Sequence, residues 1–370
     1  MKHCLSVDLS AVPQAITGAG RYGIEFLAAA QKLADQYGFE ITSLVARGDS
    51  KRISSMTRTN ALELIPQNRV ARLIYEKIQL GRVLNLKGFS LHHGIHYTMP
   101  RGFHGKVVVT IHDTTLIDHP EWHERSKVAF FTREINYAAR HADGLIFPSH
   151  FVERRFRELF DQNQPYQVIP HGVRTIVPPA DIDLDSVVGS DAVEAGYFLY
   201  CGTIEPRKNL ERIVEGYLKS KSKHFLVIVG LKGWNMAEFL SRFDNSERDS
   251  KIRILGFVDD ETLASLYRDA ICTLYPSLEE GFGLPGLEAL AYGSPLITSK
   301  GSAMEEYAVE GVVLVDPRSV DEIADAMGSI GDRGFDRERF KALGVERSHF
   351  FTWERSGEAH LTFYKKVLEG

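Results

Sequence analysis

The sequence predicts an α/β protein built from two doubly wound parallel sheets. Short apolar runs typical of buried strands alternate with longer segments that carry apolar residues at helical spacing. This alternation is interrupted at 177–185 by two prolines and a run of acids, and it then starts again. Alternating strands and helices favour parallel sheets covered by helices, and 370 residues are enough for two such domains.

Each expected element follows from its local pattern. In the first half, strands are expected at 4–9, 40–46, 90–97, 106–113, 144–148 and 167–173, and helices at 24–33, 127–141 and 152–160. In the second half, strands are expected at 197–201, 225–229, 252–255, 271–275, 294–298 and 312–315, and helices at 210–219, 263–269 and 286–292. Asn209 is expected to cap the helix that follows it, because asparagine side chains accept hydrogen bonds from the first helical N–H groups.

The composition excludes several classes of protein. A net charge of −5 gives no overall nucleic-acid footprint, so we expect no nucleic-acid partner. Cys4, Cys201 and Cys272 lie in separate strand-like runs, which favours buried thiols in a reducing compartment. No apolar run approaches the roughly 18 residues of a membrane span, and the N-terminus lacks the apolar region of a signal peptide. We therefore expect a cytoplasmic protein.

Residues 47–106 are unusually basic for this chain. They contain eleven lysines and arginines and only three acids. Solvated helix faces would explain such a run. The alternative is a surface that meets anionic lipid or a lipid-linked phosphate, which would place the protein peripherally on the inner face of the cell membrane.

The most informative stretch is 275–288, in which Glu280 and Glu288 flank a Gly-Phe-Gly-Leu-Pro-Gly turn. Glu280 is expected in the loop after a strand, and Glu288 about one turn into the next helix. Glycines and a helix N-terminus suit a phosphate, whereas carboxylates suit hydroxyl groups. The ligand that fits is a sugar joined to a diphosphate. The alternative is a tight turn with both glutamates solvated.

Three further pairs are candidate site residues. Arg207 and Lys208 follow a strand, and two adjacent cations there suit a diphosphate, although a surface pair without function is the alternative. His112 and Asp113 end another strand-like run and are interpreted as a catalytic or substrate-binding pair, with a buried structural histidine as the alternative. Gly18 and Gly20 form a glycine-rich loop whose backbone would meet a phosphate, unless they only form a turn before a helix.

Together these residues resemble the retaining glycosyltransferases of family 4, which have the GT-B fold. The likeness is carried by 202–210, by Gly256-Phe-Val and by 276–290, where Glu280 and Glu288 form an E-x7-E pattern. It implies two Rossmann-like domains facing a central cleft. Residues 1–177 with 352–370 would form the acceptor-binding domain, with a final helix crossing back onto it, and 178–351 the nucleotide-sugar-binding domain.

The resemblance also implies a role for each candidate residue. Glu280 would contact the donor sugar, Glu288 the nucleotide ribose, and His112, with Asp113 beside it, the sugar at the catalytic centre. The remaining residues would bind the nucleotide sugar: Arg207 and Lys208 at the diphosphate, Phe282, Gly283 and Leu284 through backbone amides, Phe257 and Val258 at the base, and Gly18 and Gly20 at the phosphates and acceptor. The chain departs from the family pattern at Thr203, where many relatives have arginine, and at 303–307.

The implied reaction moves a hexose from a nucleotide sugar to an acceptor hydroxyl with retention of configuration. Within the family, the chain looks most like bacterial mannosyltransferases that build lipid-linked polysaccharide such as O-antigen, so the expected donor is GDP-mannose and the acceptor a lipid-linked oligosaccharide. A UDP-hexose or deoxyhexose donor is the alternative. No metal and no cofactor are expected, because two cations and helix N-termini would stabilise the departing diphosphate.

The same residues also allow other classes of function. The pattern Gly18-x-Gly20-x-x-Gly23 is also that of a nicotinamide oxidoreductase, but the second strand is followed by Arg47-Gly-Asp49 in place of an acidic ribose partner. A sugar-nucleotide sensor would bind donor without turnover. A sugar-nucleotide epimerase would need no acceptor.

Overall fold

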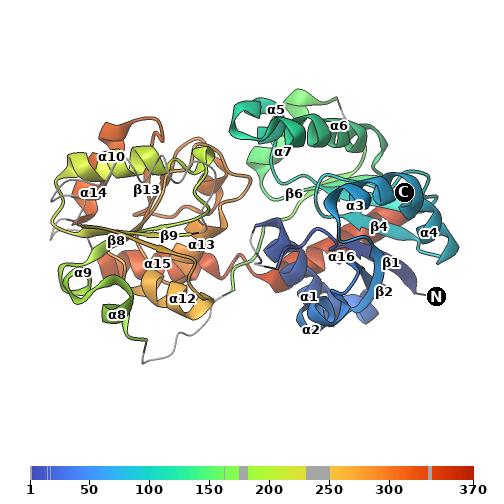
Figure 1. Ribbon diagram of the computed structural model, residues 1–370, viewed down its shortest axis with the longest axis horizontal. Coiled ribbons are helices and arrows are strands. Elements are labelled where there is room, and N and C mark those ends of the chain that lie inside the picture. Colours follow the sequence, from blue (N-terminus) through green and yellow to red (C-terminus); the bar gives the residue numbers. More distant parts are fainter. Residues whose placement is uncertain are drawn as a thin grey trace. The chain divides into compact units, whose positions relative to one another are not determined.

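The computed structural model describes residues 2–14, 16, 18–161, 163–174, 182–230, 251–331 and 336–370. The chain forms two compact units (Figure 1). Unit 1 consists of Met1–Gly172 and Phe351–Gly370, and unit 2 of Val173–Phe350. The boundary predicted at 177/178 lies outside the described residues.

The described part of unit 1 contains a seven-stranded sheet with the order β3-β2-β1-β4-β5-β6-β7. All paired strands are parallel, so every strand ends at the same edge. The strands are β1 (His3–Asp8), β2 (Phe39–Ala46), β3 (Asn60–Ile65), β4 (Leu91–Gly94), β5 (Lys106–Thr110), β6 (Gly144–Phe147) and β7 (Tyr166–Val168).

Helices connect these strands and cover the sheet. They are α1 (Ala19–Tyr37), α2 (Ser50–Thr57), α3 (Arg69–Tyr75), the π-helical turn η1 (Glu76–Leu80), α4 (Gly81–Leu86), α5 (Thr115–Asp118), η2 (Pro120–Trp122), α6 (Arg125–His141) and α7 (His150–Leu159). One core cluster lies under α6 and α7, and a smaller one, which includes Leu80 and Leu84, lies under α4.

The described part of unit 2 repeats this plan with six parallel strands in the order β10-β9-β8-β11-β12-β13. They are β8 (Tyr197–Cys201), β9 (Phe225–Val229), β10 (Ile252–Gly256), β11 (Cys272–Tyr275), β12 (Leu296–Ser299) and β13 (Val313–Val315). The helices are α8 (Leu184–Val188), α9 (Ser190–Ala195), η3 (Pro206–Lys208), α10 (Leu210–Ser220), α12 (Asp260–Asp269), α13 (Leu284–Ala291), η5 (Ala303–Tyr307), α14 (Val320–Gly331) and α15 (Arg337–Ser348).

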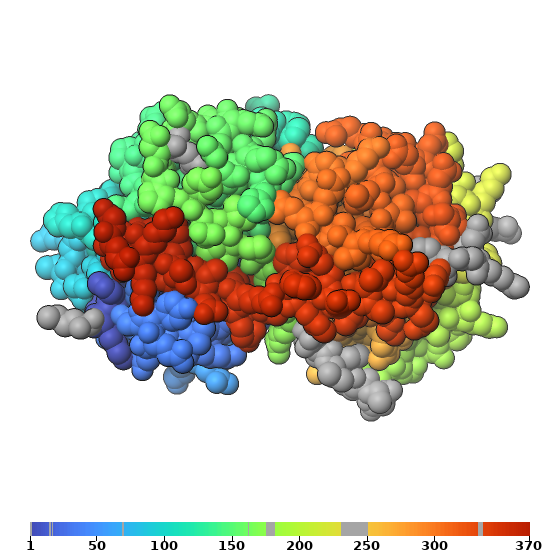
Figure 2. Space-filling view, turned by 180° about the vertical axis from the view of Figure 1, so that it is seen from behind, coloured from blue at the N-terminus to red at the C-terminus, as the bar shows by residue number. Residues whose placement is uncertain are grey.

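The last helix, α16 (Trp353–Glu369), returns to unit 1 and packs along α1. Figure 2 shows this red segment beside the blue N-terminal part of unit 1. The Tyr22 hydroxyl of α1 lies 2.8 Å from His360 Nε2, and the Tyr364 hydroxyl lies 2.7 Å from His93 Nδ1 of β4. The C-terminal helix therefore completes the core of unit 1.

Two expectations from the sequence need correction. The edge strand β3 was not predicted, because only its last residue is fully buried and its apolar pattern is weak. Asn209 does not cap α10 with its side chain: its backbone is left-handed, with φ of 62°, and its amide donates instead to the carbonyl oxygens of Pro276 and Pro317, at 2.9 and 2.6 Å. Asparagine tolerates this backbone conformation, which turns the side chain away from the helix.

The packing of α16 on α1 can be tested at Gly357. A Cβ atom at this position would lie 2.6 Å from the backbone nitrogen of Ala30. Gly357→Ala should therefore destabilise the protein by about 1–3 kcal/mol, although alanine normally favours a helix by roughly 1 kcal/mol. Thermal unfolding followed by circular dichroism would measure the loss.

Glu354→Ala is the matched control, because Glu354 is exposed on the same helix and only forms a surface ion pair with Lys32 at 3.2 Å. Its effect should stay within about 1 kcal/mol. Equal melting temperatures for the two variants would contradict the close approach of the helices.

Candidate active site

Two neighbouring strands of unit 2 carry the predicted anion-binding and sugar-binding residues. Arg207 and Lys208 lie in η3, just after β8, and Glu280 lies in the loop after β11. Strands β8 and β11 are adjacent and parallel, so these loops meet at the carboxyl edge of the sheet. Ligands of open parallel sheets bind at this edge.

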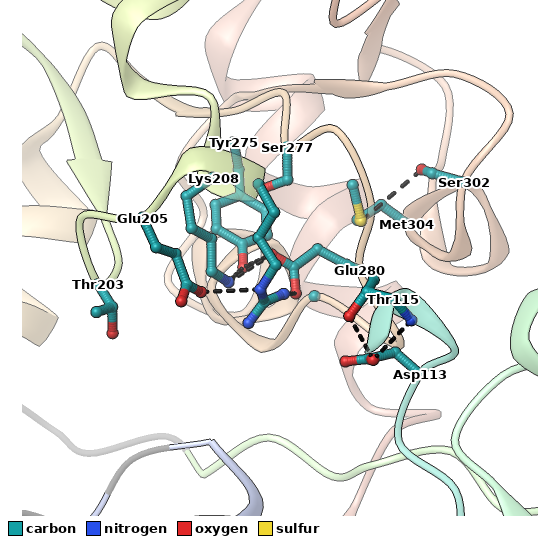
Figure 3. A network of polar contacts seen from close by, with 12 residues as sticks. Asp113, Thr115, Thr203, Glu205, Lys208, Tyr275, Ser277, Glu280, Ser302 and Met304 are labelled. Atoms are coloured by element: carbon teal, nitrogen blue, oxygen red, sulfur yellow. Dashed lines mark hydrogen bonds and ion pairs between the residues drawn. The ribbon is translucent and has the colours of Figure 1, made fainter. Parts of the chain in front are cut away.

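The structure brings Arg207, Lys208 and Glu280 into one buried ion cluster. Arg207 Nη1 donates to Glu280 Oε2 at 2.8 Å, and Lys208 Nζ pairs with Glu280 Oε1. Lys208 also donates to the Tyr275 hydroxyl at 2.5 Å, and that hydroxyl donates to Glu280 at 3.0 Å. Lys208 and Glu280 are only 8% and 6% exposed. Figure 3 shows Lys208 and Tyr275 pointing toward Glu280, with Thr203 apart from them.

The electrostatics of the cluster favour the ionised carboxylate. Burial raises the pKa of Glu280, but the charges and hydrogen bonds of Arg207 and Lys208 outweigh burial and lower this pKa to about 2. Burial also lowers the pKa of Lys208, and Glu280 offsets this only in part because Arg207 repels the ammonium. The carboxylate has two cationic partners, whereas the ammonium shares its carboxylate with Arg207. The cluster therefore holds Glu280 ionised more firmly than it holds Lys208 protonated.

Backbone and side-chain hydrogen bonds fix the two loops to each other. The Leu278 N–H donates to the Arg207 carbonyl oxygen at 2.7 Å, and Asn209 joins the same loop through Pro276. Arg207 is held from its other side by Glu205, whose carboxylate lies 2.8 Å from Nε. The guanidinium and ammonium groups are therefore oriented before any ligand binds.

The turn into α13 depends on a glycine and a tyrosine. Gly283 has φ of 84°, and a Cβ there would lie 2.7 Å from Met304 Cγ. The Tyr307 hydroxyl donates to the Gly283 carbonyl oxygen at 2.9 Å, and its ring packs against Phe282. The segment 303–307, where the chain departs from the family pattern, thus supports this turn. Leu284 is the first residue of α13, and the helix N-terminus leaves backbone N–H groups for an anion.

The remaining predicted residues of unit 2 lie at the same edge of the sheet. Glu288 is in α13, partly buried, and accepts from the Tyr267 hydroxyl at 3.2 Å. Phe257 and Val258 follow β10, which is separated from β8 by β9. Phe257 is 63% exposed and so presents an aromatic face to solvent at the edge where an aromatic base would need one.

In unit 1, the glycine loop and His112 are linked through α1. Gly18 has φ of 50° and precedes α1, and Gly20 is buried in its first turn. The ring of Tyr22, which follows in this helix, lies edge-on to His112 with ring centroids 5.1 Å apart. The structure therefore brings the start of α1 to the histidine that follows β5.

His112 is held as a neutral ring with one free acceptor nitrogen. Its Nε2 lies 2.7 Å from the Ile95 carbonyl oxygen, which only accepts, so we assign the proton to Nε2 and leave Nδ1 as an acceptor. Burial lowers the pKa of His112 despite this hydrogen bond and the nearby charge of Asp113. Tyr97 and His171 also contact the ring, and His171 was not predicted, although it follows a strand-like run.

Asp113 has different partners from His112. Its Oδ1 accepts from the Thr115 N–H at 3.1 Å and from the Thr115 hydroxyl at 2.7 Å, which fixes the turn into α5. Within the described residues no hydrogen bond joins Asp113 to His112. The aspartate therefore shapes the loop that carries the histidine.

A cluster of three buried acids near the end of β1 was not predicted from the sequence. Asp8 ends that strand and Glu76 lies in η1; both are largely buried, and burial raises the pKa of each. For Glu76, burial and the charge of Asp8 outweigh Arg72 and raise the pKa to about 8. Glu134, the third acid, pairs with Lys77 at 2.7 Å and Arg101 at 2.9 Å. Only Asp8, at the end of a strand-like run, had a sequence signal.

The comparison with known families identifies the chain. A model described as Glycosyltransferase Family 4 matches residues 16–176, and one described as Glycosyl transferases group 1 matches 190–347. The chain is a glycosyltransferase, with a family 4 domain in its first half and a group 1 domain in its second. A glycosyltransferase of this kind binds a nucleotide-sugar donor and a saccharide acceptor, and the nicotinamide oxidoreductase alternative is therefore wrong.

Relatives and solved structures agree with this glycosyltransferase assignment. The O-antigen chain mannosyltransferase B of Escherichia coli is 27% identical over 95% of this chain and 96% of its own length. The O-antigen chain mannosyltransferase RfbU of Salmonella typhimurium is 24% identical, over 84% of this chain and 86% of its own. The sucrose-phosphate synthase of Thermosynechococcus elongatus, at 18% identity, superposes over the full length of both chains with a TM-score of 0.79. The two domains of the glycosyltransferase have the GT-B fold.

The described residues contain neither a cluster of metal-ligand side chains nor a membrane-spanning helix. No group of three or more histidine, cysteine, aspartate or glutamate side chains is arranged there to hold a metal ion. None of the helices in the described ranges has the length and apolar character needed to cross a membrane.

The raised pKa of Glu76 predicts a pH-dependent stability. The folded-state pKa is about 8, above the unfolded value of roughly 4.3. The protonated glutamate therefore contributes stability that is complete below the unfolded value and is lost as pH rises through 8. Glu76→Gln mimics the protonated form, so it should lie within about 1 kcal/mol of the wild type near pH 5 and be more stable near pH 8.5 by on the order of a few kcal/mol. Urea unfolding at both pH values measures this difference.

Glu354→Gln, on the exposed face of α16, serves as the control and should change stability equally at both pH values. A Glu76→Gln variant whose difference from the wild type does not grow with pH would contradict the buried, protonated state of Glu76.

Proposed function

We propose that the glycosyltransferase moves mannose from GDP-mannose, with retention of configuration, to a lipid-linked saccharide during polysaccharide or O-antigen synthesis. The support for the sugar and the pathway is the likeness to two O-antigen chain mannosyltransferases over most of the chain. The reaction would take place in the cytoplasm, on the inner face of the membrane.

The single observation that carries the donor site is the buried ion cluster of Arg207, Lys208 and Glu280. The Glu280 carboxylate accepts charge-assisted hydrogen bonds from the Arg207 guanidinium and the Lys208 ammonium. A diphosphate accepts the same kinds of hydrogen bond, so the carboxylate occupies the place that a diphosphate would take. When the donor binds, its diphosphate would replace Glu280 as the partner of the two cations. Glu280 would then accept hydrogen bonds from the hydroxyls of the sugar, and Glu288 from those of the ribose.

Departure of the diphosphate would be stabilised by groups that are already in place. Lys208 and Arg207 neutralise its charge, and the backbone amides at Phe282, Gly283 and Leu284 extend this electrostatic site. The proposal therefore needs no metal ion. Phe257 and Val258 would contact the base, with Phe257 offering the exposed ring.

Unit 1 would supply the acceptor side of the reaction. The unprotonated Nδ1 of His112 would accept a hydrogen bond from a sugar hydroxyl at the reacting end of the donor, and Asp113 would keep its loop in position. The backbone at Gly18 and Gly20, at the start of α1, would approach the phosphates and the acceptor.

A donor panel tests this function directly. The full chain is incubated with a lipid-linked saccharide and GDP-mannose, UDP-glucose or UDP-galactose, and released nucleotide and product are measured. We expect GDP release and an α-linked product only with GDP-mannose, at a rate unchanged by EDTA. Transfer from a UDP-sugar alone would overturn the donor, a β-linked product would overturn retention, and donor binding without transfer would favour a sensor.

The ion cluster is tested by removing its two most buried charges, those of Lys208 and Glu280, together. A single Lys208 or Glu280 variant leaves a buried charge with too few partners, which costs about 3–5 kcal/mol and confuses folding with catalysis. The double variant Lys208→Met/Glu280→Gln should stay folded and lose transfer by about 100-fold or more in kcat/KM.

Lys219→Met/Asp321→Asn is the matched control, since these residues form an exposed ion pair between α10 and α14 of the same unit. It removes the same two charges and should leave kcat/KM unchanged. Wild-type kcat/KM in the Lys208/Glu280 double variant would refute the proposed donor site.

A further inference from the structure

In unit 1, α3, η1 and α4 follow one another as a continuous helical segment (Figure 1). One face of this segment is apolar and is left uncovered by the rest of the described chain. Four of its large apolar side chains are exposed: Val70 by 65%, Ile74 by 54%, Ile78 by 70% and Leu86 by 78%. The opposite face packs Leu80 and Leu84 against Leu44 and Ile65 of the sheet. Exposed apolar stripes of this kind mark interaction surfaces.

The geometry of the segment keeps this stripe on one side. Val70, Ile74 and Ile78 recur every four residues, and such a spacing advances about 40° beyond each full α-helical turn. The π turn η1 holds more residues per turn and so offsets the drift. The segment starts where Asn68 accepts from the Val70 and Ala71 N–H groups and ends at Gly88, whose φ is 72°. From Val70 to Leu86 the stripe is roughly 24 Å long.

The exposed charges on the segment itself are basic, whereas Lys77 and Arg101 nearby are paired with Glu134, and Lys106 with Asp143. Between Leu64 and His112 the chain has seven basic residues and a single acid, Glu76. Glu76 of η1 is buried on the inner side of the segment, whereas Arg82 and Lys87 of the same segment are exposed. A second copy of this face would bring like charges together. A surface with dense negative charge over an apolar interior complements both features.

We propose that the face formed by Val70, Ile74, Ile78 and Leu86, with Arg82 and Lys87, docks on the surface of an anionic phospholipid bilayer. The helix would lie in the plane of the membrane, with the apolar side chains below the headgroups and the basic side chains among the phosphates. This inference rests on the proposed function only in that a lipid-linked acceptor would be found at such a surface.

Vesicle sedimentation without donor or acceptor tests docking separately from catalysis. The wild-type chain should bind vesicles that contain phosphatidylglycerol and not pure phosphatidylcholine vesicles, and about 0.5 M salt should release it by screening. Ile74→Ser/Ile78→Ser should lower the partition coefficient by about 10-fold or more. Arg82→Glu/Lys87→Glu should abolish the preference for anionic vesicles.

Val193→Ser/Ile254→Ser is the matched control, because these exposed apolar residues of unit 2 are each 41% exposed and lie outside the face. It should bind vesicles like the wild type. Equal binding of the Ile74/Ile78 variant and this control would overturn the proposal, as would a wild-type dimer in solution that the Ile74/Ile78 variant dissociates. Vesicle binding by a chain that transfers no sugar would leave docking intact and refute only the proposed function.

Discussion

The buried carboxylate of Glu280 is the point on which the architecture of unit 2 depends. Removing three charges from water is costly unless each has a partner, and here two cations share one carboxylate. This requirement fixes the adjacent loops after β8 and β11, because both must deliver their side chains to one place. The amide of Asn209, the Tyr275 hydroxyl and the Leu278 N–H then hold that geometry.

The buried polar side chains of unit 1, by contrast, include several histidines. Its buried histidines remain neutral: burial lowers the pKa of His96 to about 3 and of His360 to about 4. The Tyr22 hydroxyl hydrogen-bonds to His360, and the Thr110 and Tyr364 hydroxyls hydrogen-bond to His93, so these two rings have polar partners without carrying charge. Unit 2 thus contains a buried cluster of paired charges, whereas the buried histidines of unit 1 are uncharged.

The sequence predicted those parts of the fold and site that depend on local pattern. The buried strands are short apolar runs, and Glu280 and Glu288 fall in the loop and helix expected from the turn between them. The partnership of Glu280 with Arg207 joins positions 73 residues apart, and no local pattern encodes it. The edge strand β3 was missed because its apolar pattern is weak, and the helical segment that follows it was missed because its exposed face is apolar as well as its buried face.

The basic segment 47–106 shows what the structure adds to a count of charges in the sequence. Eleven bases against three acids indicated a positive region but not its location or its use. The fold turns Glu76 inward, and burial with the charge of Asp8 raises its pKa to about 8, so this acid adds little negative charge near neutral pH. Arg82 and Lys87 stay outside, beside four apolar side chains. Because Glu76 faces inward, the outer face of this helical segment carries basic and apolar side chains together.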